Sequence, residues 1–287
     1  MMEWTLAGAL LVQAAPLVEP GAEVRALTAT ILDEGGQAIL GLARDDVAFL
    51  ENGVAREITS FKPDRRPLSV AVVVDTSEAL RSDYRLSVVD AVIGLIARLP
   101  LDTRYAVWTT GDRPTKIVDY TEDKGEASKA LVRVFPQGGN YMLDALAEAS
   151  RDLKKETREG DRTVVVALTG LGPEFSYRDK FRAAEEAEAN ADLFLLAEMD
   201  GSGGDFDTRS RMSYVFDRLA RASGGQHEVV LSALGADSAL RKLSPWLEGG
   251  YRVAYATLPD LKKRKYELTV ARPGTRVVLP AASESGP

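Results

Sequence analysis

The sequence predicts an α/β protein with a doubly wound, mostly parallel sheet and a small β module built from the N- and C-terminal segments. Two observations predict this fold class. The runs "LSVAVVV" and "RTVVVAL" are continuously apolar, which is typical of strands buried on both faces, as in a parallel sheet between two helical layers. Segments with apolar residues at helical spacing alternate with these runs, whereas both ends of the chain contain short strands and turns.

The first part of the chain predicts the β module over residues 17–66. Short apolar runs between residues 23 and 61 are separated by the turn "DEGG" at 33–36 and by Asn52-Gly53. Asn-Gly between two apolar runs is a strong signal for a β-hairpin. The segment "KPDRRP" at 62–67 then indicates a linker to the next domain.

The first 16 residues predict a signal peptide and therefore a secreted or periplasmic protein. An apolar stretch runs from Trp4 to Val12, and Val12-Gln13-Ala14 has the spacing of small residues that is typical of signal-peptidase sites. Glu3 precedes this stretch and no Lys or Arg does, so the alternative is an apolar strand or helix packed on the domain of a cytoplasmic protein. No other segment is long and apolar enough to span a bilayer.

Residues 67–248 predict the doubly wound domain, element by element. A strand at 68–75 precedes a helix at 83–99, and two strands at 104–120 joined by "GDRP" predict an antiparallel pair at the sheet edge. Helices at 142–155, 178–190, 209–222 and 237–247 then alternate with strands at 162–170, 192–199 and 227–230. The strands within 249–280 have no helix between them, so we expect them to pack with the N-terminal module, leaving a tail at 281–287. The buried stripe of the first helix is expected to contain Leu86, Val89, Ile93, Ile96 and Leu99.

Composition excludes several classes of function. The chain of 287 residues has a net charge of −7, which argues against a nucleic-acid-binding protein. It contains no cysteine, so disulfides, thiolate metal sites and cysteine nucleophiles are excluded. Any Ser/His/Asp triad would depend on the single histidine, His227, with Ser223 or Ser232, and no Gly-x-Ser-x-Gly elbow occurs. We therefore expect a protein that is not an enzyme.

Three further features are interpreted as structural. The basic run at 262–265 indicates a solvated hairpin turn between two strands. The segment "DGSGGDFD" at 200–207 alternates acids and glycines but lacks the downstream glutamate of a calcium loop, so it predicts a surface loop. Trp108 and Trp246 lie on apolar patterns and are expected in the core.

Asp75 is the strongest candidate for a functional residue because it follows a buried strand. In an open parallel sheet, ligands bind at the carboxyl ends of the strands where the winding reverses. The order of three motifs, Asp-Thr-Ser at 75–77, Gly-Gly-x-x-x-x-Asp-Ala-Leu at 138–146 and Leu-Thr-Gly at 168–170, resembles the von Willebrand factor type A domain, a Rossmann-like fold. The flanking segments resemble those of secreted bacterial proteins related to this domain, so the resemblance covers about residues 23 to 280.

The resemblance implies a metal-ion-dependent adhesion site, which this sequence retains only in part. Asp75 and Ser77 match that site, whereas Ala79 replaces its second serine, Asn140 its threonine and Gly170 its second aspartate. One carboxylate offsets only half the charge of Mg²⁺, an ion that demands near-octahedral oxygen ligands. Glu78 and Glu174 are close in sequence to these loops and would compensate if they pointed inward, but nothing in the sequence shows that they do. We therefore expect a degenerate site with no metal and no cofactor. The alternative is a residual Mg²⁺ or Mn²⁺ site in which Asp75, Ser77 and Asn140 are the ligands.

The predicted function is a non-enzymatic, exported interaction or adhesion domain that binds an unknown protein partner. The loops at 77–81, 138–142, 170–177 and 200–207 would form its binding face. The alternatives are a metal-dependent adhesin or sensor, an enzyme that depends on His227, and a scaffold whose ligand face is vestigial. The candidate ligand-binding residues are Asp75, Thr76, Ser77, Glu78, Asn140, Tyr141, Thr169 and Gly170.

Overall fold

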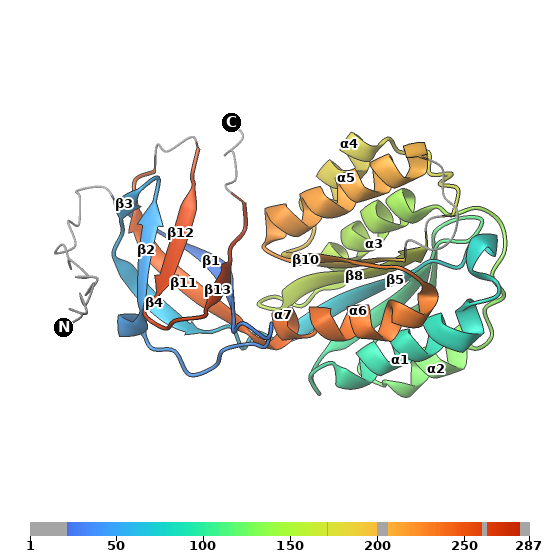
Figure 1. The fold of residues 1–287 in the computed structure, drawn as a ribbon, viewed down its shortest axis with the longest axis horizontal. Coiled ribbons are helices and arrows are strands. Elements are labelled where there is room, and N and C mark those ends of the chain that lie inside the picture. Colours follow the sequence, from blue (N-terminus) through green and yellow to red (C-terminus); the bar gives the residue numbers. More distant parts are fainter. Residues whose placement is uncertain (1–21, 171, 200–205, 260–262, 282–287) are drawn as a thin grey trace, which may run out of the picture.

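The computed structural model describes residues 22–170, 172–199, 206–259 and 263–281, and these form an α/β domain beside a β module (Figure 1). This arrangement confirms the predicted fold class. The proposed signal peptide lies outside the described residues. Within the described ranges, no helix has the length and the apolar character that crossing a bilayer requires.

A six-stranded sheet forms the centre of the α/β domain, in the order β10-β9-β8-β5-β6-β7. All neighbours in this sheet are parallel except β6 and β7, which form the antiparallel edge pair that the sequence predicts. Every side chain of β5 and of β9 is buried, which explains why their sequences are apolar except at Ser69 and Glu198. The strands are β5 (Leu68–Val74), β6 (Arg104–Thr109), β7 (Thr115–Thr121), β8 (Arg162–Gly170), β9 (Leu193–Met199) and β10 (Gln226–Val230).

Two layers of helices cover this sheet (Figure 1). On one face Val70, Val72 and Val74 pack against α1, α2 and α6, and on the other Ala71 and Val73 pack against α3, α4 and α5. The sequence analysis missed α2, and α7 splits the predicted helix at 237–247. The helices are α1 (Val89–Arg98), α2 (Gly125–Leu131), α3 (Met142–Glu156), α4 (Lys180–Glu188), α5 (Phe206–Ser223), α6 (Ala236–Leu243) and α7 (Pro245–Glu248).

The start of the helix predicted at 83–99 differs from the prediction. Residues Tyr84–Val88 form a π-helical turn before α1 begins. The π-turn contains more residues than an α-helical turn, so the apolar stripe loses its register across it. Tyr84 and Val88 are buried as a result, and Leu86, which we expected in the buried stripe, is exposed.

The β module is built from both ends of the chain, as expected. One sheet has the order β13-β1-β11-β4 and the other the order β12-β2-β3, so C-terminal strands pair with N-terminal strands in both. Asn52 and Gly53 form the hairpin turn between β2 and β3, both with positive φ. The strands are β1 (Glu23–Leu32), β2 (Val47–Glu51), β3 (Val54–Ala55), β4 (Ile58–Pro63), β11 (Gly250–Thr257), β12 (Tyr266–Val270) and β13 (Arg276–Val278).

One residue of the basic run at 262–265 corrects the expectation of a fully solvated turn. Arg264 is completely buried, and its guanidinium lies 2.6 Å from a carboxylate oxygen of Glu51, which is also buried. Arg264 also donates to the hydroxyl of Thr257 and to the carbonyl of Leu258. The run therefore contributes a buried ion pair that joins β2 to the segment before β12.

Candidate functional site

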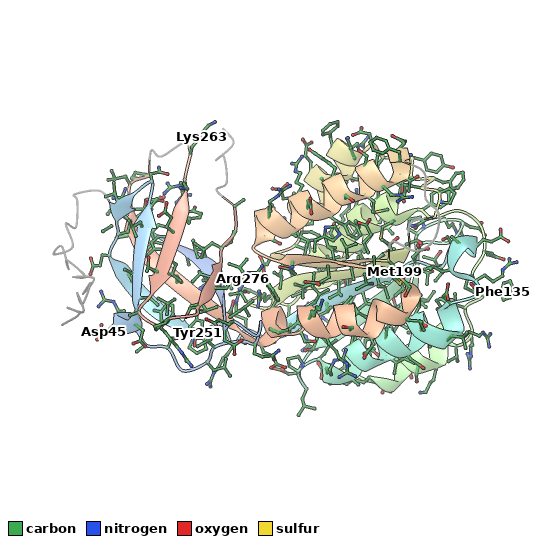
Figure 2. The ribbon with its side chains drawn as sticks, in the orientation of Figure 1. Asp45, Phe135, Met199, Tyr251, Lys263 and Arg276 are labelled. Carbon is green, nitrogen blue, oxygen red and sulfur yellow. The ribbon has the colours of Figure 1, made fainter. Side chains whose placement is uncertain are left out.

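The candidate site lies where the carboxyl ends of β5 and β8 meet. These two strands are neighbours, and the helices that follow them, α1 and α4, lie on opposite faces of the sheet. A crevice forms at such a reversal because the two following loops diverge. This end of the domain is the one away from the β module, marked in Figure 2 by Met199, the last residue of β9, whereas Tyr251 marks the module.

The carboxylate of Asp75 is completely buried where β5 ends, and it accepts hydrogen bonds on both oxygens. Its donors come from the loops that follow β5 and β6, from the segment before α3, and from the end of β8. Oδ1 accepts from the backbone N–H of Ser77 (2.8 Å) and from the hydroxyl of Thr110 (3.4 Å). Oδ2 accepts from the backbone N–H of Gly170 (2.9 Å), the side-chain amide of Asn140 (3.1 Å) and the hydroxyl of Thr169 (3.1 Å).

Burial and hydrogen bonding act in opposite directions on this carboxyl. Burial raises the pKa of Asp75 because it disfavours the charged form, whereas the N–H groups of Ser77 and Gly170 and the hydroxyl of Thr169 lower it. The net direction is upward. The surrounding protein thus provides neutral donors at an acid that is removed from water.

A second carboxyl, that of Glu174, is buried beside Asp75. Its side chain accepts hydrogen bonds from the backbone N–H groups of Ser176 (2.9 Å) and Met142 (3.3 Å). Burial raises the pKa of Glu174 to about 7, and the charge of Asp75 adds to this rise. A second buried acid, on the loop after β8, is therefore close enough to interact electrostatically with Asp75.

Close packing between loops holds these side chains in place. The hydroxyl of Thr76 accepts a hydrogen bond from the N–H of Gly111, which ties the loop after β5 to the loop after β6. A Cβ added at Gly139 would lie 2.2 Å from the ring of Phe175, so only glycine allows that ring to pack there. Replacing this glycine would displace the ring of Phe175.

Two buried oxygen atoms of the site have no hydrogen-bond partner among the described residues: Ser77 Oγ and Asn140 Oδ1. Oxygen atoms of this kind can bind a cation. However, the Asn140 amide nitrogen and four other donors already point at Asp75, and no group of three or more His, Cys, Asp or Glu side chains suited to a metal occurs in the described part of the chain. The side chains present do not fit the complete oxygen shell of Mg²⁺.

The structure brings most of the sequence-predicted residues together and separates one from them. Asp75, Ser77, Asn140, Thr169 and Gly170 contact one another directly, as described above. The side chain of Glu78 instead is exposed and pairs with Arg81 at 3.2 Å. Thr110 was not predicted, and Glu174 was considered only as an acid that could compensate for the one missing at Gly170. The position of Thr110 directly after β6, a neighbour of β5, is the signal that could have identified it.

Aromatic side chains form an exposed cluster beside the crevice. The ring of Tyr141 lies 6.3 Å from that of Phe175 and 6.0 Å from that of Tyr177, measured between centroids. Phe175 is 54% exposed and Tyr177 is 91% exposed. We call Tyr141, Phe175 and Tyr177 the aromatic cluster.

His227 does not form the hydrogen bond that a catalytic triad needs. Its Nδ1 lies 2.9 Å from Asp217 and its Nε2 lies 3.2 Å from Glu198, so carboxylates occupy both ring nitrogens. The hydroxyl of Ser223 donates instead to the carbonyl of Leu219. A nucleophile and its general base must be hydrogen-bonded or nearly so, and this pair is not.

Comparison with known proteins agrees with the α/β fold of the domain that contains Asp75. Residues 70–173 match the family described as the von Willebrand factor type A domain. This segment of the chain is similar to the von Willebrand factor type A domain. This match runs from within β5 to the loop after β8, so it includes Asp75 and Asn140 and ends one residue before Glu174. No curated protein sequence matched the chain.

Solved structures show the same fold at low sequence identity. A von Willebrand factor type A protein from Catenulispora acidiphila is similar over 86% of this chain and 75% of its own, with 13% identity and a TM-score of 0.56. Proximal thread matrix protein 1 from the mussel byssus is similar over 69% of this chain and 50% of its own, with 18% identity and a TM-score of 0.53. Another structure of the mussel protein has a zinc-occupied adhesion-site motif (16% identity, 69% and 49% coverage, TM-score 0.47).

Proposed function

We propose that this chain is a non-enzymatic, exported protein-binding protein whose von Willebrand factor type A domain binds its partner without a metal ion. The single observation that supports the proposal is the set of donors around Asp75. Five hydrogen-bond donors lie within 3.4 Å of its carboxylate oxygens. A buried carboxylate needs either a cation or such donors, and here the protein itself supplies the donors.

A metal ion would have to displace these contacts. The amide nitrogen of Asn140 has no lone pair to offer a cation, and it donates to Asp75 Oδ2 and to the hydroxyl of Thr169. A cation would require that amide to turn so that its oxygen faced inward, with both hydrogen bonds lost. The substitutions at Ala79 and Gly170 remove a hydroxyl and a carboxylate that would otherwise offset this loss.

The aromatic cluster supports partner binding at this end of the domain. Interfaces are enriched in Tyr, Trp and Phe, and a few such residues supply most of the binding energy. The side chain of Tyr177 is highly exposed, but its backbone N–H donates to the buried carboxylate of Asp144 (2.9 Å), which anchors this residue to α3. We propose that the partner covers the aromatic cluster and the loop at 77–81.

Site-specific photo-crosslinking tests the binding face. A photoreactive amino acid at Tyr177 is expected to give a discrete adduct from an envelope extract, and the yield should not change when EDTA is added. Leu101 is the matched control, because it is also 91% exposed but precedes β6 at the opposite end of the sheet. Equal adducts from both positions would refute the proposed face.

Calorimetric titration tests the metal-free site. We expect no saturable binding of Mg²⁺ or Mn²⁺ at micromolar concentration, and no change in the heats for Asp75→Ala. The two unpartnered oxygens, Ser77 Oγ and Asn140 Oδ1, favour the alternative of a residual metal site. Saturable binding that Asp75→Ala abolishes would establish that alternative and overturn the metal-free proposal.

Export and the domain boundaries are part of the same proposal. The proposed units are a signal peptide over 1–16, a module formed by 17–66 with 249–280, and a binding domain over 67–248. Mass spectrometry of the mature protein is expected to find an N-terminus close to residue 15. An intact N-terminus on the protein from its native host would refute export by cleavage.

A further inference from the structure

A groove separates the β module from the α/β domain, at the end of the sheet opposite the candidate site. Its volume is about 1150 Å³. One wall is the end of β4 with the linker at 62–67, and the other is the end of α3, the start of β8 and the loop between α4 and β9. Pockets for small molecules are usually about 300 to 1,000 Å³, so this open groove has room for a longer segment.

Positive charge dominates the lining of this groove. Six basic and four acidic side chains line it, in a chain whose net charge is −7. Each of the four acids already has a partner within the protein. These pairs are Asp64 with Arg66 (2.7 Å), Asp161 with the hydroxyl of Ser69 (2.8 Å), Asp192 with the backbone N–H of Thr163 (3.1 Å) and Glu188 with Arg218 (3.0 Å).

Three cations on the module side, Lys62, Arg65 and Arg252, make no ion pair or side-chain hydrogen bond within the described residues. Lys62 and Arg252 are directly opposite each other on the antiparallel strands β4 and β11. Like charges at opposed positions destabilise a sheet. The fold therefore retains a repulsive pair that no acid of the groove relieves.

Protection of a sheet edge does not account for this pair. A lysine on an edge strand can prevent association with another sheet, and β4 is an edge strand. Arg252, however, lies on β11, which has strand partners on both sides. On the opposite wall Lys154 and Arg158 also face the groove, where Lys154 caps the carbonyl of Ala189 and Arg158 contacts the exposed Glu122.

We propose that this groove binds an extended acidic segment of a partner polypeptide. Carboxylates along the segment would pair with Lys62, Arg65 and Arg252 and would relieve the repulsion between β4 and β11. Guanidinium groups suit this role because they bind carboxylates with two parallel hydrogen bonds. This site is independent of the binding face around Asp75, and the two lie at opposite ends of the sheet.

Fluorescence anisotropy with the full chain and a labelled octaglutamate peptide tests the proposal. We expect saturable binding that weakens as salt is raised, because exposed ion pairs are screened. Lys62→Ala with Arg252→Ala should raise Kd about tenfold, which corresponds to about 1.4 kcal/mol. Lys155→Ala is the matched control, since this exposed lysine does not line the groove, and it should leave Kd unchanged.

A second variant separates loss of binding from loss of folding. Arg252→Glu would face Lys62 with an opposite charge, so it should raise the melting temperature while it abolishes peptide binding. Asp75→Ala should bind the peptide as the wild type does, which keeps this test separate from that of the proposed function. Absence of octaglutamate binding, equal displacement of the peptide by inorganic phosphate or a sulfated polysaccharide, or an unchanged Kd in the double variant would overturn the proposal.

Discussion

Replacing Glu174 with glutamine perturbs the buried carboxyl pair of the candidate site with a minimal change of shape. Glutamine keeps one acceptor oxygen but is neutral at every pH. Its amide nitrogen would face the backbone N–H of either Ser176 or Met142, because each now donates to one oxygen of Glu174. An unsatisfied buried donor costs about 1 to 3 kcal/mol, so this part of the change destabilises the variant at all pH values.

The charge of Glu174 adds a contribution that depends on pH. Its pKa is about 7 in the folded protein against 4.5 for the free side chain, chiefly because of burial. Below pH 4.5 the carboxyl of Glu174 is protonated in both the folded and the unfolded state, and its contribution to the free energy of unfolding is fully present. Between pH 4.5 and 7 the carboxyl loses its proton only in the unfolded state, which favours unfolding. The free energy of unfolding is therefore lower by about 3 kcal/mol once the pH exceeds 7. The Glu174→Gln variant lacks this loss.

Urea unfolding at pH 4.5 and pH 8 measures the effect. The free energy of unfolding of Glu174→Gln minus that of the wild type is expected to rise by about 3 kcal/mol from the lower to the higher pH. Titrating groups that do not interact with Glu174 cancel in this difference, whereas Asp75, which is coupled to Glu174, contributes to it. Glu78→Gln is the matched control, because Glu78 is an exposed carboxyl on the neighbouring loop. If the difference between Glu174→Gln and wild type were the same at both pH values, the buried position of Glu174 beside Asp75 would be refuted.

Three further predictions concern partner binding and stability. Tyr177→Ala should weaken partner binding by about 2 kcal/mol in a binding titration, as expected for an interface hot spot, and leave the melting temperature unchanged. Arg264→Ala should lower the free energy of unfolding by about 1 to 3 kcal/mol in urea, because the buried Glu51 loses its charged partner at 2.6 Å and keeps Arg56 at 3.1 Å; an unchanged free energy would contradict this. His227→Gln should lower the free energy of unfolding more at pH 6 than at pH 9, because, against the opposing effect of burial, Glu198 and Asp217 raise the pKa of His227. The stabilising charge of the imidazolium is lost as the pH rises through that pKa. Equal effects at the two pH values would contradict this prediction.

The strands and the centre of the site could be predicted from the sequence because their signals are local. A strand covered on both faces has few polar positions, so the central parts of β5, β8 and β9 are visible as apolar runs. The residue that follows such a strand lies at its carboxyl end, which places Asp75 next to Thr169 once the strands are paired. Asn140 joins them because the chain passes the same end before α3 begins.

Glu174 and Leu86 could not be placed in this way. Glu174 lies in a loop without periodicity, and its carboxyl faces inward only because the loop packs back over Gly139. Leu86 fits an α-helical stripe, but the π-turn at 84–88 changes the spacing of side chains around the helix. In each case the backbone path, rather than the residue type, determines the direction of the side chain.

The sequence by itself determined the layer architecture, the return of the C-terminal strands to the N-terminal module and the position of one acid at a strand end, because burial and turn chemistry act over a few neighbouring residues. Only the tertiary structure decided the second acid of the crevice, the buried pair of Glu51 and Arg264, and the basic groove between module and domain. Their members lie far apart in the chain, and electrostatic interactions depend on distance in space, which a linear pattern does not contain.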